Sequence, residues 1–91
     1  MKRVHLIISG FVQGVGFRSW VRREAQKLGV VGWVKNRDDG AVEIVGEGTE
    51  DKLRELIKLV RIGPEVAEVT QVDIKWSSVS TCKFSEFVII L

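Results

Sequence analysis

The sequence predicts an α+β fold in which two helices cover one face of a single, mostly antiparallel β-sheet. Two segments carry apolar residues at helical spacing, and five shorter segments carry apolar runs or the alternation that is typical of strands. Glycine, proline and aspartate separate these segments in the order strand, helix, strand, strand, helix, strand and a final short strand. Two helices of similar length must both bury an apolar stripe, and one face of the sheet can cover both stripes.

The chain begins with a strand over residues 4–9 and a helix over residues 18–28. The apolar face of the strand consists of Val4, Leu6 and Ile8. The apolar stripe of the helix consists of Phe17, Val21, Ala25 and Leu28. Gly29 follows directly, as expected where a helix ends in the left-handed conformation.

A β-hairpin follows the first helix. Its strands cover residues 30–35 and 41–47, and Val42 and Ile44 mark the apolar face of the second strand. Asp39-Gly40 lies between them, and an Asp-Gly pair tolerates the positive φ angles that a tight hairpin turn requires.

The second helix begins after Thr49, which we expect to cap its first turn. Its buried stripe consists of Leu53, Leu56, Ile57 and Val60, and Gly63-Pro64 ends it. Alternating apolar residues then predict a strand over residues 70–76. A polar loop over residues 77–83 leads to a last apolar strand over residues 84–91.

This order of elements is typical of the split βαβ arrangement of a ferredoxin-like open sandwich. Right-handed crossovers place the first two strands parallel to each other, with the third strand between them. The loop after the first strand and the end of the second strand then lie at the same end of the sheet. We therefore expect Arg18 and Asn36 to be neighbours, although 18 residues separate them in the chain.

The composition limits the functions that the chain can have. Its 91 residues and 45% hydrophobic content predict one domain over residues 1–91 with a single core. The sequence has no run of 18 apolar residues and no secretion signal, and Cys82 is its only cysteine. We therefore expect a cytoplasmic monomer without a membrane segment, a disulfide or a multi-cysteine zinc site. A net charge of +2 suits a small anionic substrate and is too mild for a dedicated nucleic-acid-binding protein.

Residues 10–18, Gly-Phe-Val-Gln-Gly-Val-Gly-Phe-Arg, join the first strand to the first helix. Gly14 and Gly16 allow sharp turns that leave backbone N–H groups uncovered, and the start of the helix adds further N–H groups. The Arg18 guanidinium adds charged donors at the same place. Such groups can bind a phosphate-sized anion, but the same residues can also form a turn that only lets the helix approach the sheet. No Gly-Lys-Ser or Gly-Lys-Thr follows, so the run is not a nucleotide P-loop.

The other candidate residues carry weaker patterns. Asn36 has an amide that can orient a water molecule, but asparagine is also common in turns. His5 stands in its strand without an evident acidic partner or nucleophile, which favours a structural or surface role. The three tryptophans, Trp20, Trp33 and Trp76, are scattered over three elements, which favours packing over a platform for stacking bases.

Taken together, the motifs resemble those of the acylphosphatases, small enzymes that hydrolyse acyl phosphates. The resemblance rests on residues 10–18, on Gly-Trp-Val-Lys-Asn at 32–36 and on Asp-Gly-Ala-Val-Glu at 39–43, and it extends over residues 4–76. It implies the ferredoxin-like fold and a small-molecule acyl phosphate as the substrate.

The resemblance also implies roles for individual residues. Arg18 would be the catalytic, phosphate-binding arginine, and Asn36 would position the attacking water. The phosphate cradle would be the backbone of Gln13, Gly14, Val15, Gly16 and Phe17. A carboxylate leaving group needs no general acid, and the sequence has no cluster of metal ligands, so we expect hydrolysis without a metal or cofactor.

Two alternatives to an enzyme follow from the same residues. A non-catalytic phosphate-binding or regulatory domain on this fold would share every feature except activity. An RNA-binding module would need exposed aromatic residues on its middle strands, and residues 4–8 and 41–45 contain none.

Overall fold

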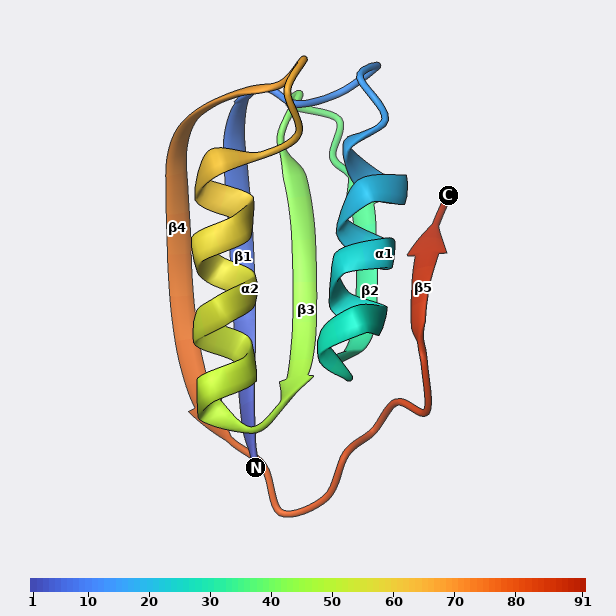
Figure 1. Ribbon diagram of the computed structural model, residues 1–91, viewed down its shortest axis with the longest axis vertical. Coiled ribbons are helices and arrows are strands. Elements are labelled where there is room, and N and C mark those ends of the chain that lie inside the picture. Colours follow the sequence, from blue (N-terminus) through green and yellow to red (C-terminus); the bar gives the residue numbers. More distant parts are fainter.

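The computed structural model describes residues 1–91 as one five-stranded sheet with two helices on one of its faces (Figure 1). The elements along the chain are β1 (Lys2–Phe11), α1 (Phe17–Leu28), β2 (Val31–Asn36), β3 (Val42–Gly48), α2 (Glu50–Ile62), β4 (Glu68–Ser78) and β5 (Phe87–Ile90). The strands lie in the order β4-β1-β3-β2-β5. β3 pairs antiparallel with β1 and β2, β4 pairs antiparallel with β1, and β5 pairs parallel with β2. The α+β ferredoxin-like fold is therefore confirmed.

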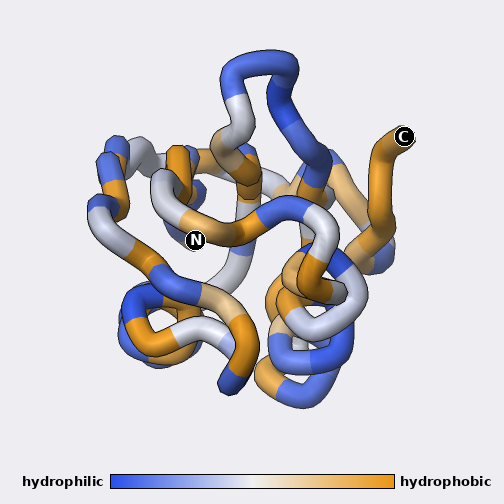
Figure 2. The backbone as a smooth tube through the Cα atoms, turned by 90° about the horizontal axis from the view of Figure 1, so that it is seen from above, coloured by the Kyte–Doolittle hydropathy of each residue, from blue (hydrophilic) through white to orange (hydrophobic).

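The hydrophobic core fills the space between the sheet and the two helices, which form a separate layer when seen along the strands (Figure 2). Alternation along β1 turns Val4, Leu6 and Ile8 toward the helices, as predicted, and all three are fully buried. The buried stripes of the helices are also those predicted, except that Leu28 is only partly buried. Neither helix is long and apolar enough to cross a membrane.

The start of α2 differs from the prediction. Thr49 does occupy the position before the helix, but its hydroxyl donates a hydrogen bond to the Asp51 carboxylate at 2.6 Å and does not cap a backbone N–H. This hydrogen bond lowers the pKa of Asp51 below its usual value. The first turn is favoured instead by the negative charges of Glu50 and Asp51, which lie at the positive end of the helix dipole.

The last strand is shorter than predicted. β5 begins at Phe87 because residues 79–86 carry the chain across the end of the sheet, from β4 at one edge to β5 at the other (Figure 1). The buried carboxylate of Glu47 holds this connection. It accepts a hydrogen bond from the backbone N–H of Lys83 at 2.7 Å and pairs with the Arg3 guanidinium. Burial raises the pKa of Glu47, but these partners outweigh burial, and the pKa lies below its ordinary value.

Candidate functional site

The loop between β1 and α1 presents a run of backbone N–H groups without partners. Gly14 and Gly16 both have a φ of +76°, a backbone conformation that residues other than glycine rarely adopt. Gly16 is also the residue directly before α1, and no side chain caps the helix there. The first N–H of this segment to find an acceptor in the protein is that of Trp20, which donates to the Gly16 carbonyl at 3.1 Å. The N–H groups of residues 14–19 are therefore free to bind an anion.

Arg18 lies in the first turn of α1, directly after these N–H groups. None of the ion pairs in the chain includes Arg18, so no carboxylate competes for its guanidinium. Arg18 and the loop line a cavity of about 220 Å³. An unpaired guanidinium beside unpaired N–H groups makes this cavity suitable for an anion that accepts several hydrogen bonds, such as a phosphate.

Asn36, the last residue of β2, lines the same cavity as Arg18. The predicted juxtaposition of these two residues is therefore confirmed, and it follows from the parallel course of β1 and β2 on either side of β3. The Oδ1 atom of Asn36 is buried and accepts no hydrogen bond from the protein. A buried acceptor without a donor is costly, and a water molecule is a suitable donor for it. Asn36, a residue that lines the cavity, thus has an amide oxygen that no donor of the protein uses.

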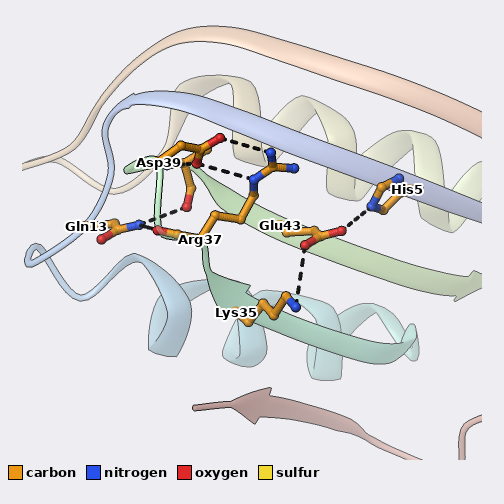
Figure 3. Close-up of polar contacts among 7 residues, drawn as sticks. His5, Gln13, Lys35, Arg37, Asp39 and Glu43 are labelled. Carbon is orange, nitrogen blue, oxygen red and sulfur yellow. Dashed lines mark hydrogen bonds and ion pairs between the residues drawn. The ribbon is translucent and has the colours of Figure 1, made fainter.

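The side chain of Gln13 connects the loop to the β2–β3 turn. Its amide nitrogen donates to the backbone carbonyl oxygens of Arg37, at 2.8 Å, and Ala41, at 2.9 Å (Figure 3). On the other side of the turn, the Asp39 carboxylate accepts hydrogen bonds from the N–H of Ala41 and from the Arg37 guanidinium. The Ala41 N–H and the Arg37 side chain lower the pKa of Asp39 below its usual value. The sequence predicted a role for the backbone of Gln13, and this contact of its side chain was missed.

The expectation that His5 has no acidic partner is wrong. The ring Nε2 of His5 pairs with Glu43, whose other carboxylate oxygen lies 3.9 Å from the Lys35 ammonium (Figure 3). These side chains lie on the open face of the sheet, because they alternate with the core residues of β1, β2 and β3. The cavity lies on the helix side of the sheet, so His5 does not reach it. Its role in the structure is a cross-strand contact, as the structural interpretation of His5 predicted.

The tryptophans are also packing residues and do not form a common platform. Trp20 packs against Phe17, with 5.6 Å between the ring centroids. Trp33 lies under the Lys35 ammonium, and Trp76 lies under the Arg54 guanidinium. No group of three or more His, Cys, Asp or Glu side chains is arranged to hold a metal ion. The cavity that Arg18 and Asn36 line is therefore the candidate functional site of the chain.

Comparisons with a family model, with related sequences and with solved structures all match this chain to one family. The family model described as Acylphosphatase matches residues 4–89. A protein from Thermococcus kodakarensis named acylphosphatase is 55% identical over 78 residues, which cover 84% of this chain and 86% of that protein. An acylphosphatase from Methylococcus capsulatus is 43% identical over 90 residues, covering 99% of this chain and 97% of the relative. The crystal structure of an acylphosphatase from Bacillus subtilis matches with a TM-score of 0.94 and 41% identity, and each chain is covered completely.

Proposed function

Since the chain belongs to the acylphosphatase family and hydrolyses acyl phosphates, we propose that Arg18 and the loop before it hold the phosphate while Asn36 positions the attacking water. The phosphate would accept hydrogen bonds from the backbone of Gln13, Gly14, Val15, Gly16, Phe17 and Arg18. One observation carries the proposal. The free N–H groups, the unpaired guanidinium and the free Asn36 oxygen belong to residues of one loop and one strand end that border a single cavity.

These groups suit the transition state of phosphoryl transfer. Negative charge is spread over the three equatorial oxygens of the transferring group, and the attacking and leaving oxygens lie roughly in line. Fixed N–H donors and a guanidinium stabilise that charge without having to reorganise during the reaction. Removing one such donor typically costs about 3 kcal/mol of transition-state stabilisation. A loop that offers several donors can thus supply much of the catalysis.

The proposed reaction needs neither a general acid nor a covalent intermediate. The water oxygen attacks phosphorus as the bond between phosphorus and the acyl oxygen breaks, and the electron pair of that bond leaves with the carboxylate. The proton of the water passes to an oxygen of the phosphate. The amide of Asn36 does not titrate in the useful range, so its contribution is the orientation of the water, which reduces the entropic part of the barrier.

We also propose that the reaction requires no metal ion and no other cofactor. The support is chemical: the guanidinium and the N–H groups supply the positive charge that a metal would otherwise provide at the phosphate. We further propose that residues 1–91 form one domain and that the protein is a monomer. We place it in the cytoplasm and expect it to bind no nucleic acid. The exposed, unpaired thiol of Cys82 is consistent with a reducing compartment.

The experiment that tests this function is the steady-state hydrolysis of benzoyl phosphate with and without EDTA. We expect turnover of the parent chain in EDTA, and loss of turnover in Arg18→Ala and Asn36→Ala. Arg22→Ala is the matched control, because Arg22 is an exposed arginine on the same helix. A folded chain that binds inorganic phosphate but does not turn over the substrate would support the anion-binding domain instead. Turnover that EDTA abolishes and Mg²⁺ restores would overturn the proposal of metal-free hydrolysis.

A further inference from the structure

The cavity at Arg18 has an apolar part that phosphate binding does not use. Its polar part comes from the loop, from Arg18 and from Asn36. Its apolar part consists of Val12, Phe17, Ile89 and Leu91. The negative charge of a phosphate group is spread over its outer oxygens, so contact with apolar surface does not stabilise its binding. The apolar part therefore points to the rest of the substrate.

Only two of these apolar side chains are accessible to a ligand. Val12 and Phe17 are 1% exposed and belong to the hydrophobic core. Ile89 is partly buried, and Leu91 is exposed. The apolar surface that a ligand can touch is thus supplied by β5 and the residue that follows it, and the C-terminal segment is hydrophobic throughout (Figure 2).

The pairing of β5 fixes which of its side chains reach the cavity. β5 runs parallel to β2, with Ile89 opposite Val34 and Ile90 opposite Lys35. Alternation turns Ile89 to the helix side of the sheet, where Val34 is buried, and turns Ile90 to the open face. Because β5 is parallel to β2, it runs toward the end of the sheet at which β2 ends with Asn36 (Figure 1).

We propose that Ile89 and Leu91 bind the acyl group of the substrate, so that the chain prefers acyl phosphates with an apolar acyl group to acetyl phosphate. This inference rests on the proposed binding of the phosphate at Arg18. A cavity of about 220 Å³ is smaller than the 300 Å³ or more of most sites for drug-sized ligands. The acyl group is therefore short, a chain of a few carbons or a single ring.

The test compares acetyl phosphate with butyryl phosphate, because the two leaving carboxylates are of nearly equal basicity and differ in apolar surface. We expect the parent chain to have a kcat/KM roughly 15-fold higher for butyryl phosphate, since it has two more methylene groups and burying each of them is worth about a factor of four. In Ile89→Ser and Leu91→Ser we expect the KM for butyryl phosphate to rise several-fold, while kcat/KM for acetyl phosphate changes little.

Ile90→Ser is the matched control, because it makes the same change on the open face of the same strand. It should leave the preference for butyryl phosphate intact. Inhibition by inorganic phosphate should be equal in all variants, which shows that the phosphate site is preserved. If Ile89→Ser does not fold, Leu91→Ser at an exposed position carries the test.

Two negative results can be told apart. Equal kcat/KM values for both substrates in the parent chain, or the same loss of preference in Ile90→Ser, would overturn the acyl site and leave the proposed function standing. A parent chain that hydrolyses neither substrate would overturn the proposed function and this inference with it.

Discussion

The side-chain amide of Gln13 donates a hydrogen bond to the backbone carbonyl oxygen of Arg37 at 2.8 Å, joining two loops that are 24 residues apart in the chain (Figure 3). Gln13 belongs to the loop that carries the free N–H groups, and Arg37 directly follows Asn36. The contact therefore sets the separation between the groups that we propose to bind phosphate and the residue that we propose to orient water. We therefore expect Gln13 to act as a positioning residue through its side chain.

Replacing Gln13 with leucine should impair catalysis more than folding. The variant loses both hydrogen bonds to the β2–β3 turn, and a displacement of about 1 Å at the site can lower the rate by about 100-fold. We expect kcat/KM to fall by between 10-fold and 100-fold in steady-state assays. Gln71→Leu, at an exposed position on β4, is the control and should retain the parent value. A Gln13→Leu variant with unchanged kcat/KM would show that the contact is dispensable.

Replacing Arg18 with lysine tests the geometry of the donors separately from their charge. Lysine keeps the positive charge but loses the planar fork that can bind two phosphate oxygens at once. We expect kcat/KM to fall by at least about 100-fold, a change of about 2.7 kcal/mol in transition-state stabilisation. The melting temperature should change little, because Arg18 forms no ion pair. An active Arg18→Lys variant would mean that charge alone suffices.

Replacing Asn36 with alanine should separate binding from turnover. The loss of the water-orienting amide acts on the transition state, so kcat should fall strongly while inhibition by inorganic phosphate is retained. The free energy of unfolding should be unchanged or higher, because the variant removes a buried oxygen that has no donor. Parallel kinetic and urea-denaturation measurements check both parts. A raised KM with a normal kcat would assign Asn36 to substrate binding instead.

Replacing Glu47 with glutamine should reduce stability in a pH-dependent way. The variant leaves Arg3 without its carboxylate, at a cost of about 2 kcal/mol at pH 7, less than for a fully buried pair because Arg3 is 25% exposed. The pKa of Glu47 is lowered in the folded chain, so its charge stabilises the fold above the ordinary pKa of about 4.3. That contribution is lost as the pH falls through the lower, folded-state pKa.

Urea denaturation of Glu47→Gln and the parent chain from pH 7 down to pH 2 measures this effect. The difference in unfolding free energy should be largest near neutral pH and should shrink below about pH 4. A difference that is constant over the whole range would show that the charge of Glu47 contributes nothing to the fold.

The fold and the centre of the site follow from local patterns in the sequence. Helical and strand periodicity define the elements, and the preference for right-handed crossovers brings Arg18 and Asn36 to one end of the sheet. The bounds of the strands other than β5 lie within two residues of those predicted. These features depend on residues that are close in the chain or on a general rule of topology, which is why the sequence reveals them.

The features that were missed depend on contacts between distant segments. The burial of Glu47 requires the N–H of Lys83, 36 residues later, and no local pattern marks it. The late start of β5 reflects the distance that residues 79–86 must cross. The sequence predicted an earlier start because Phe84 is apolar and was assigned to the strand. The pairing of His5 with Glu43 depends on the alignment of β1 with β3, which periodicity alone does not determine.

The most direct test of the proposed site is a titration of the isotope-labelled chain with inorganic phosphate, followed through the backbone amide resonances. We expect the largest shifts at Gly14, Gly16, Arg18 and the other residues of the 14–19 segment, in the parent chain and in Asn36→Ala, and their loss in Arg18→Ala. Unchanged resonances for residues 14–19, with shifts confined to a second cavity that Arg37 and Lys75 line, would contradict the proposed site.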